Sequence, residues 1–130
     1  MNALDTNILI YHAVKDSKFS KRASVIMARI ENGEEIFVPL TVLKEFMFDM
    51  LARGKNIAYI IETFALLQKS NVRIQEDDFG TFIRGIQMAD EYKINPTDGV
   101  IAATMQKHGI TEIYSNDPDF DRVPGIKRTF

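Results

Sequence analysis

Four acidic residues occupy positions where a parallel α/β sheet is expected to bind a ligand. Each follows an apolar, strand-like run or lies in the opening turns of a helical pattern; they are Asp5, Glu45, Asp98 and Asp117. Such positions converge at the carboxyl edge of the strands, where open parallel sheets bind ligands. Carboxylates in a chain without cysteine favour a hard divalent cation, Mg²⁺ or Mn²⁺. We therefore expect a metal site made of oxygen ligands.

The chemistry that such a site favours is hydrolysis of a phosphodiester bond. One metal ion generates a nucleophilic water and a second stabilises the leaving oxygen, at a separation of about 3.5–4 Å. Thr6 and Ser115 are candidates for orienting a carboxylate or a water, with ordinary turn hydrogen bonding as the alternative. Asn7 is a further potential oxygen ligand or capping group.

Each acid also has a local structural explanation. Asp5 is a good N-cap for a helix, and Glu45 is favourable near the N-terminus of its helix because of the helix dipole. Asn95, Pro96 and Asp98 resemble a capping box with aspartate in place of glutamate. These explanations do not exclude a functional role, because one carboxylate can cap a helix and bind a ligand.

The neighbours of Asp98 and Asp117 suggest two further interpretations. Gly99 lowers helix propensity by roughly 1 kcal/mol relative to Ala, which favours a close approach of another group to the backbone at this point. Asp117 lies in a segment of Asn, Asp and Pro residues that forms turns in its own right. We interpret the following acids, Asp119 and Asp121, as surface charges.

The composition is that of one ordinary globular domain spanning residues 1–130. The chain is 45% hydrophobic and 26% charged, which suffices for a core without disulfides. The absence of cysteine excludes thiolate metal sites and cysteine nucleophiles. No apolar run approaches the roughly 20 residues of a membrane span. The N-terminus has no secretory pattern, so we expect a cytoplasmic protein.

Strand-like and helix-like runs alternate along the chain, which predicts βαβ units and a parallel sheet with right-handed crossovers. The expected strands are residues 1–4, 36–38, 72–74 and 112–115, with a possible edge strand at 127–130. The apolar periodicity and the Gly and Pro stop signals predict helices at residues 6–11, 23–30, 41–53, 57–67, 79–89 and 96–108.

The charge pattern gives little information about a nucleic-acid partner. The formal net charge is −2, but local fields matter more than the total. The basic residues are scattered; they include Lys15, Lys18, Lys21, Arg22, Lys44, Arg53, Lys55, Lys127 and Arg128. Some of them can line a groove that holds a phosphate backbone. We see no stretch of interleaved aromatic and basic residues that indicates a platform for single strands.

Four sequence blocks, each containing one of the acids, carry a family resemblance. They are Leu-Asp-Thr-Asn-Ile-Leu-Ile-Tyr at 4–11, Val-Pro-Leu-Thr-Val-Leu-Lys-Glu-Phe at 38–46, Thr-Asp-Gly-Val-Ile-Ala-Ala-Thr at 97–104, and Ile-Tyr-Ser-Asn-Asp-Pro-Asp-Phe at 113–120. In this order they resemble the PIN-domain ribonucleases, in particular the small VapC-type toxins. The resemblance spans nearly the whole chain and shows no departure at the four acids.

The resemblance implies a three-layer PIN-like α/β domain with a central parallel sheet of about five strands flanked by helices. It implies that Asp5, Glu45, Asp98 and Asp117 are catalytic and bind metal, with Ser115 where the family places Thr or Ser. The implied activity is endonucleolytic cleavage of RNA with Mg²⁺ or Mn²⁺ as cofactor. The implied partners are RNA, a second copy in a homodimer, and an antitoxin that wraps the helices and can reach the acid pocket.

Residues 46–51 lie in the region where this family binds partners. We expect its apolar residues to be helix core with one exception; the residues are Phe46, Met47, Phe48, Met50 and Leu51. The exception is Phe48, because it shares a helix face with Glu45, opposite the apolar face. It is therefore expected to border a groove or a subunit contact.

Other functions remain as alternatives. An RNA-processing PIN nuclease outside toxin–antitoxin systems fits the same residues, and so does an inactive PIN scaffold that binds RNA or protein, although intact acids count against inactivity. A haloacid-dehalogenase-like phosphatase requires a second Asp two residues after the first, where this chain has Asn7. A phosphoacceptor receiver domain requires a pair of early acids and a mid-chain Asp at a strand end, and neither is apparent.

Overall fold

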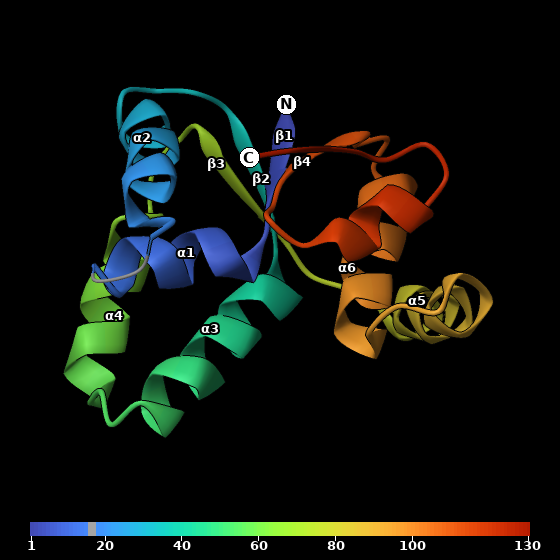
Figure 1. The fold of residues 1–130 in the computed structure, drawn as a ribbon, viewed down its shortest axis with the longest axis horizontal. Helices are drawn as coiled ribbons and strands as arrows, with labels where there is room; N and C mark the ends of the chain where they lie inside the picture. The colour runs from blue at the N-terminus through green and yellow to red at the C-terminus, as the bar shows by residue number, and fades with distance from the viewer. Residues whose placement is uncertain (16–17) are drawn as a thin grey trace.

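A parallel sheet forms the centre of the computed structural model, which describes residues 1–15 and 18–130 (Figure 1). Within these residues the sheet has five strands in the order β3-β2-β1-β4-β5, and every neighbouring pair is parallel. The strands are β1 (Asn2–Leu4), β2 (Ile36–Pro39), β3 (Val72–Gln75), β4 (Glu112–Tyr114) and β5 (Lys127–Thr129). Ala3 in the central strand pairs with Phe37 on one side and Ile113 on the other.

Helices cover both faces of the sheet, which confirms the predicted three-layer α/β architecture. The helices are α1 (Thr6–Ala13), α2 (Ser20–Glu31), α3 (Leu40–Ala52), α4 (Ile57–Ala65), α5 (Phe79–Tyr92) and α6 (Pro96–Lys107), followed by the 3₁₀ helix η1 (Pro118–Arg122). Figure 1 shows α1 and α2 on one side of the sheet and α5 and α6 on the other. The segment 118–122, expected to be part of a turn, is the 3₁₀ helix.

Side-chain caps fix where several of these helices begin. The carboxylate or amide oxygens of Asp5, Asn56, Asp78 and Asn95 each accept a hydrogen bond from a backbone N–H in the first turn. Such a cap satisfies one of the N–H groups that a helix leaves without an internal partner. Pro96 follows the cap of α6 at the first helical position, where its missing N–H costs nothing.

The main core lies between the central strands and the helices that follow them. All four residues of β2 are buried, as expected for an inner strand of a parallel sheet with both faces covered. Phe46 and Met50 of α3 are fully buried and Phe48 is 66% exposed, as predicted, whereas Leu51 is 40% exposed and is therefore not core. No helix among the described residues has both the length and the apolar character needed to cross a membrane.

Helices α5 and α6 touch through their backbones at two glycines. A Cβ atom built on Gly99 would lie 2.1 Å from the carbonyl oxygen of Gly85, and a Cβ on Gly85 would lie 2.4 Å from the Cα of Val100. Both distances are far below van der Waals contact, so neither position has room for a side chain. The close approach predicted at Gly99 is therefore made by α5.

Candidate active site

Asp5 is held in place at the carboxyl end of the central strand. It follows β1 directly, caps α1, and is 4% exposed. One carboxylate oxygen accepts the N–H of Thr6 at 2.7 Å, and the other accepts the hydroxyl of Ser115 at 2.5 Å. Because both of these donors are neutral, they fix the geometry of the carboxylate without balancing its charge.

Glu45 is positioned by two threonine hydroxyls from different helices. It lies in the second turn of α3, which starts directly after β2. Its Oε1 accepts the hydroxyl of Thr6 at 3.1 Å, and its Oε2 accepts the hydroxyl of Thr97 at 3.0 Å. Glu45 therefore connects the N-terminal turns of α1 and α6, and both of its oxygens have a neutral donor.

Asp98 lies in the first turn of α6 and is 7% exposed. The expected capping box does not form as predicted, because the side chain of Asn95 accepts from the N–H of Thr97, and the carboxyl group of Asp98 lies beside those of Asp117 and Asp119. Three carboxylate oxygens, one each from Asp98, Asp117 and Asp119, lie within 4.8 Å of one another. These three groups form the most crowded part of the site.

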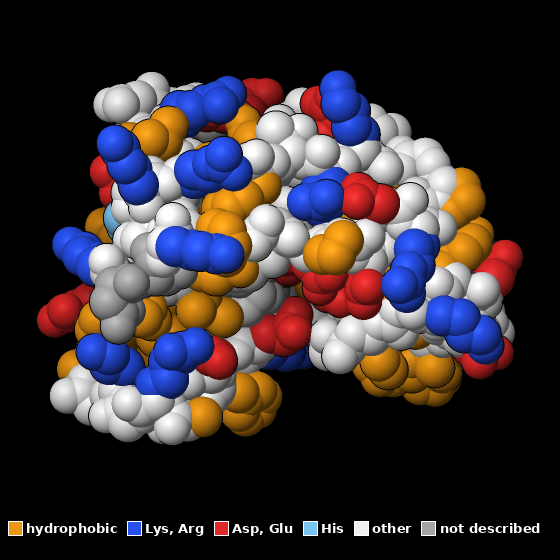
Figure 2. Space-filling view, in the orientation of Figure 1, with side chains coloured by type: hydrophobic (Ala, Val, Ile, Leu, Met, Phe, Trp, Pro, Cys, Tyr) orange, Lys and Arg blue, Asp and Glu red, His pale blue; other side chains and the backbone are white. Residues whose placement is uncertain are grey.

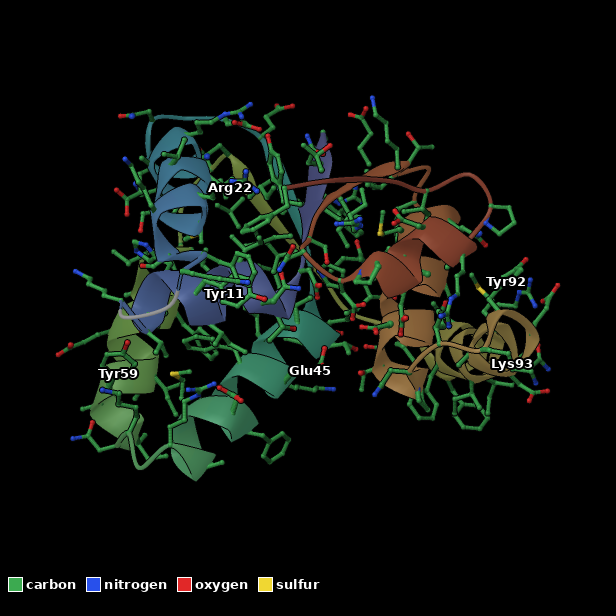
Figure 3. All side chains as sticks on the ribbon, in the orientation of Figure 1. Tyr11, Arg22, Glu45, Tyr59, Tyr92 and Lys93 are labelled. Atoms are coloured by element: carbon green, nitrogen blue, oxygen red, sulfur yellow. The ribbon has the colours of Figure 1, made fainter. Side chains whose placement is uncertain are left out.

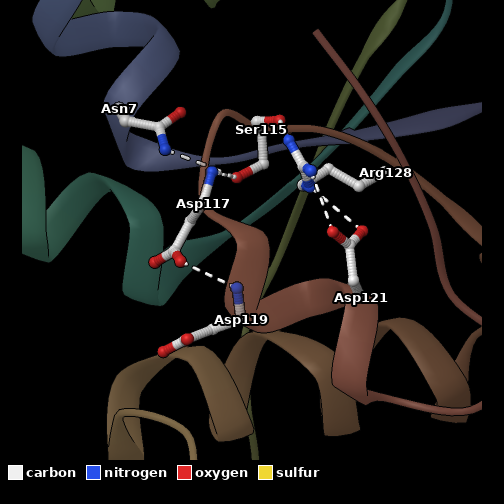
Figure 4. A network of polar contacts seen from close by, with 6 residues as sticks. All are labelled: Asn7, Ser115, Asp117, Asp119, Asp121 and Arg128. Carbon is white, nitrogen blue, oxygen red and sulfur yellow. Dashed lines mark hydrogen bonds and ion pairs between the residues drawn. The ribbon is translucent and has the colours of Figure 1, made fainter.

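The segment after β4 is held by a network of polar contacts around Ser115 (Figure 4). The buried Ser115 hydroxyl donates to Asp5 and accepts from the side chain of Asn7 at 3.3 Å and from the N–H of Asp117 at 2.9 Å, so its hydrogen-bonding capacity is filled. Arg128 binds the carboxylate of Asp121 through two nitrogens, at 3.1 and 2.8 Å, and donates to the carbonyl of Ser115 at 3.4 Å.

Burial, together with the neighbouring charges, raises the pKa of three acids in this pocket. Burial raises the pKa of Asp5 to about 6, against the lowering effect of its hydrogen bonds to Ser115 and Thr6. Burial also raises the pKa of Glu45, although both threonine hydroxyls oppose this. The pKa of Asp98 rises to about 8, first through burial and then through the charges of Asp5, Asp117 and Glu45. The acids therefore repel one another when no cation is bound.

An oxygen-rich, electrostatically strained pocket of this kind fits a hard divalent cation. Mg²⁺, Mn²⁺ and Ca²⁺ prefer carboxylate oxygens. A cation also reverses the effect of the crowded charges, because it stabilises the ionised form of each acid. Asp98, Asp117 and Asp119 are placed to share an ion, and the charges of Asp5 and Glu45 also act on Asp98.

The structure thus brings together all four acids selected from the sequence, together with Thr6, Asn7 and Ser115. Two further residues of the pocket were not selected. Asp119, interpreted as a surface charge, is partly exposed and pairs with Arg122 at 3.7 Å, but one of its oxygens also lies within 4.8 Å of Asp98 and Asp117. The second unselected residue is Thr97, and its position directly before Asp98 in the sequence could have indicated that it belongs to the pocket. Asp121 is exposed and paired with Arg128, as expected of a surface charge.

A hollow of about 430 Å³ adjoins the acids on the side of Glu45. Its walls come from α3, α5, the start of α6 and the segment before α5; they include Lys44, Phe48, Asp77, Phe82, Ile86 and Thr97. The prediction that Phe48 borders a groove next to Glu45 is confirmed. Glu45 and Thr97 belong to both the hollow and the acid pocket, so the two spaces are continuous.

Three solved structures share the fold of the whole chain. VapC20 of Mycobacterium tuberculosis, described as a toxin that cleaves the sarcin–ricin loop, is 18% identical with a TM-score of 0.78, covering 93% of each chain. VapBC2 of Rickettsia felis bound to promoter DNA is 17% identical with a TM-score of 0.71, and a toxin–antitoxin complex from Klebsiella pneumoniae is 22% identical with a TM-score of 0.65; both cover 98% of this chain and 96% of the other.

The comparison with family models gives a match over almost the same length. The model described as the PIN domain matches residues 3–126, which include all of the acids in the pocket. A comparison with curated protein sequences finds no match. The family match, the parallel sheet and the fold shared with VapC toxins agree with the resemblance in the sequence: this chain belongs to the PIN-domain family.

Proposed function

We propose that the protein is a metal-dependent endoribonuclease that hydrolyses RNA phosphodiester bonds, and that it is the toxin of a toxin–antitoxin pair. The observation that carries the proposal is the meeting of Asp5, Glu45, Asp98 and Asp117 in one pocket at the carboxyl edge of the sheet. Membership of the PIN-domain family and the fold of VapC toxins support it. The catalytic unit is residues 1–130 as a single domain, acting in the cytoplasm where its RNA substrate is.

The proposed cofactor is Mg²⁺ or Mn²⁺, held by Asp5, Glu45, Asp98 and Asp117, with Asp119 as an additional ligand. When bound, such ions supply a nucleophilic water and charge stabilisation for the leaving oxygen. The chain itself supplies the geometry. Ser115 and Thr6 position two of the acids by donating to Asp5 and Glu45, and Asn7 donates to the Ser115 hydroxyl.

The toxin role rests on exposed apolar surface that a partner protein would cover. Four large apolar side chains on α3 and α4 are exposed; they are Phe48, Leu51, Ile57 and Ile61. Monomeric soluble proteins seldom expose apolar patches of this kind unless they bind a partner. We assign this surface to the antitoxin, because it begins beside Glu45, and a bound chain there can reach the acid pocket.

A second apolar face supports a homodimer. The outer side of α5 exposes Phe79, Phe82, Ile83 and Ile86, with Phe79 78% exposed. These residues follow the helical period and form one stripe. The double variant Phe79→Ser/Ile83→Ser is expected to convert a dimer into a monomer by light scattering while the circular dichroism spectrum stays unchanged. A wild-type monomer at micromolar concentration would contradict the dimer.

The experiment that tests the activity is cleavage of a panel of labelled RNAs with Mg²⁺, with Mn²⁺ and with chelator. The variants are Asp5→Asn and, as a matched control, Asp121→Asn, which removes an acid of the same type outside the pocket. We expect metal-dependent cleavage by the wild type and the control, and none by Asp5→Asn. Cleavage that persists in chelator would contradict the metal site.

The panel also separates the proposed function from its alternatives. RNA that is bound and left intact with every metal would identify a scaffold. Growth arrest on expression, relieved by co-expression of a protein encoded next to the gene, is the expected result for a toxin. A nuclease that cuts a defined precursor RNA without arresting growth would instead be an RNA-processing enzyme.

A further inference from the structure

Three aromatic rings from distant parts of the sequence meet beside the acid pocket. Tyr11 lies in α1, Phe19 directly precedes α2, and Phe130 directly follows β5. The ring centroids of Tyr11 and Phe19 are 5.0 Å apart, those of Phe19 and Phe130 are 5.7 Å apart, and those of Tyr11 and Phe130 are 5.9 Å apart. All three side chains are partly exposed, so the rings form an aromatic strip at the surface.

Two cations lie against the rings of this strip. The Nζ of Lys18 is 4.8 Å from the centre of the Phe19 ring, and the guanidinium of Arg22 is 5.7 Å from the centre of the Phe130 ring. Within residues 1–15 and 18–130, neither cation has a carboxylate partner. Both cations therefore bring positive charge to the strip.

A chain of contacts connects the strip to the acid pocket. The hydroxyl of Tyr11 accepts the side-chain N–H of Asn116 at 3.3 Å, and the backbone N–H of Asn116 donates to Asn7 at 3.4 Å. Asn7 in turn binds the Ser115 hydroxyl that holds Asp5. Tyr11 is thus two contacts away from the residues that position the acids.

The surface of the molecule shows the same continuity. In Figure 3, Arg22, Tyr11 and Glu45 follow one another from α2 across α1 to α3. Figure 2 shows acidic side chains gathered at the centre of this face, with basic and hydrophobic side chains beside them on the side of α1 and α2. At its outer end the strip borders a hollow of about 300 Å³, whose lining includes Arg22, Phe130 and Thr129.

We infer that the strip of Tyr11, Phe19 and Phe130 binds single-stranded RNA on one flank of the bond that the acids cleave. Unpaired bases pack against the rings, and Lys18 and Arg22 contact the phosphates between them. This inference rests on the proposed function and assigns residues to its substrate. Aromatic rings with interspersed cations are the means by which proteins hold single strands without reading their sequence. The two cations against the rings, and the contacts that connect Tyr11 to the residues around Asp5, favour a polyanion as the occupant of the strip.

The test compares two double variants that remove the same kinds of group. Arg22→Gln/Phe130→Leu removes a cation and a ring from the strip, and Arg22 is exposed and Phe130 partly exposed. Lys55→Gln/Tyr59→Leu is the control, because Lys55 lies 5.1 Å from the Tyr59 ring in a similar pair on the side of α4. Figure 3 shows Tyr59 away from Tyr11 and Arg22.

Binding is measured by fluorescence anisotropy, in chelator and in an Asp98→Asn background, with a labelled single-stranded RNA of about 12 nucleotides. We expect the strip variant to weaken binding at least about fivefold, as for the loss of one stacked base. For the strip variant, the slope of log Kd against log salt concentration is expected to decrease by about one, because one phosphate contact is lost. The control variant and a duplex RNA of the same sequence are expected to show no such change.

Cleavage kinetics in the wild-type background give a second readout. The strip variant is expected to raise the KM for a long single strand while its kcat, and its KM for a dinucleotide, stay within about twofold of wild type. Unchanged RNA binding by the strip variant, equal weakening by the control, or no RNA binding by the Asp98→Asn protein would overturn the inference. A wild type that binds RNA through the strip and cleaves none would overturn the proposed activity alone.

Discussion

Replacing Asp98 with asparagine is expected to stabilise the metal-free protein and to abolish its activity. The pKa of Asp98 is raised from 3.8 to about 8 because its carboxyl group is buried among three other acids. A raised folded-state pKa means that the folded protein holds a proton that the unfolded chain has lost. Between about pH 4 and pH 8 this group therefore costs the folded state more stability as the pH rises.

The size of the effect follows from that pKa. Each pKa unit corresponds to about 1.4 kcal/mol, so ionising Asp98 in the folded protein costs at most about 6 kcal/mol. The neighbouring acids share this cost, because they titrate together, and we expect a measured gain of about 1–3 kcal/mol for Asp98→Asn. For a domain of this size, 1 kcal/mol raises the Tm by about 3–5 °C.

The assay is thermal unfolding in chelator near pH 8.5 and near pH 5, followed by titration with Mn²⁺. The variant is expected to melt higher than wild type at the higher pH. The difference is expected to be smaller at the lower pH, because pH 5 lies only about one unit above the unfolded pKa of Asp98. Mn²⁺ is expected to raise the Tm of the wild type and to raise that of the variant much less.

Asp121→Asn provides the control for the loss of one negative charge. Its carboxylate is exposed and paired with Arg128, so its removal is expected to leave the Mn²⁺ response intact. An Asp98→Asn protein that melts below wild type at the higher pH in chelator, or that responds to Mn²⁺ as wild type does, would refute the electrostatic reasoning. Cleavage by that variant with Mn²⁺ would remove Asp98 from the mechanism.

Three further outcomes are expected. Thr97→Val removes the hydroxyl that donates to Glu45 at 3.0 Å and is expected to lower kcat by about tenfold or more. Thr97→Ser keeps a hydroxyl and is expected to retain most of the kcat; equal losses in both variants would show that packing rather than the hydroxyl matters. Gly99→Ala places a Cβ 2.1 Å from a backbone oxygen of α5 and is expected to lower the free energy of unfolding, measured in urea, by about 3 kcal/mol or more. Gly80→Ala is the control and is expected to have a much smaller effect, because its nearest atom is 3.5 Å away in a flexible side chain. Calorimetric titration with Mn²⁺ near pH 6.5 in buffers of different ionisation heat is expected to show proton release, since Asp98 must ionise to bind metal; identical heats would count against this.

The fold was predictable because its local signals agree with one another. Apolar runs at 36–38 and 113–114 are short, and each is followed by polar residues that end the strand or cap a helix. When the strands pair in parallel, their carboxyl ends lie at the same edge of the sheet, and each acid lies at a strand end or a helix start there. This is why Asp5, Glu45, Asp98 and Asp117 were found from the sequence.

The parts that escaped prediction depend on contacts between distant residues. Thr97 binds Glu45 across 52 positions, and nothing near Thr97 in the sequence indicates that partner. Asp119 reaches Asp98 because Pro118–Arg122 forms a 3₁₀ helix, whereas the local composition indicates only a turn. The aromatic strip is invisible in the sequence for the same reason, since its rings come from positions 11, 19 and 130.

The contact between Gly85 and Gly99 connects the acid pocket with the exposed apolar stripe of α5. Gly99 is the neighbour of Asp98, and Gly85 lies between Ile83 and Ile86 on the helix whose outer stripe we assign to a second copy. With no side chain between the two backbones, there is nothing soft to absorb a displacement of α5. A protein bound to that helix would therefore press directly on the backbone next to Asp98, so assembly and chemistry would share one rigid support.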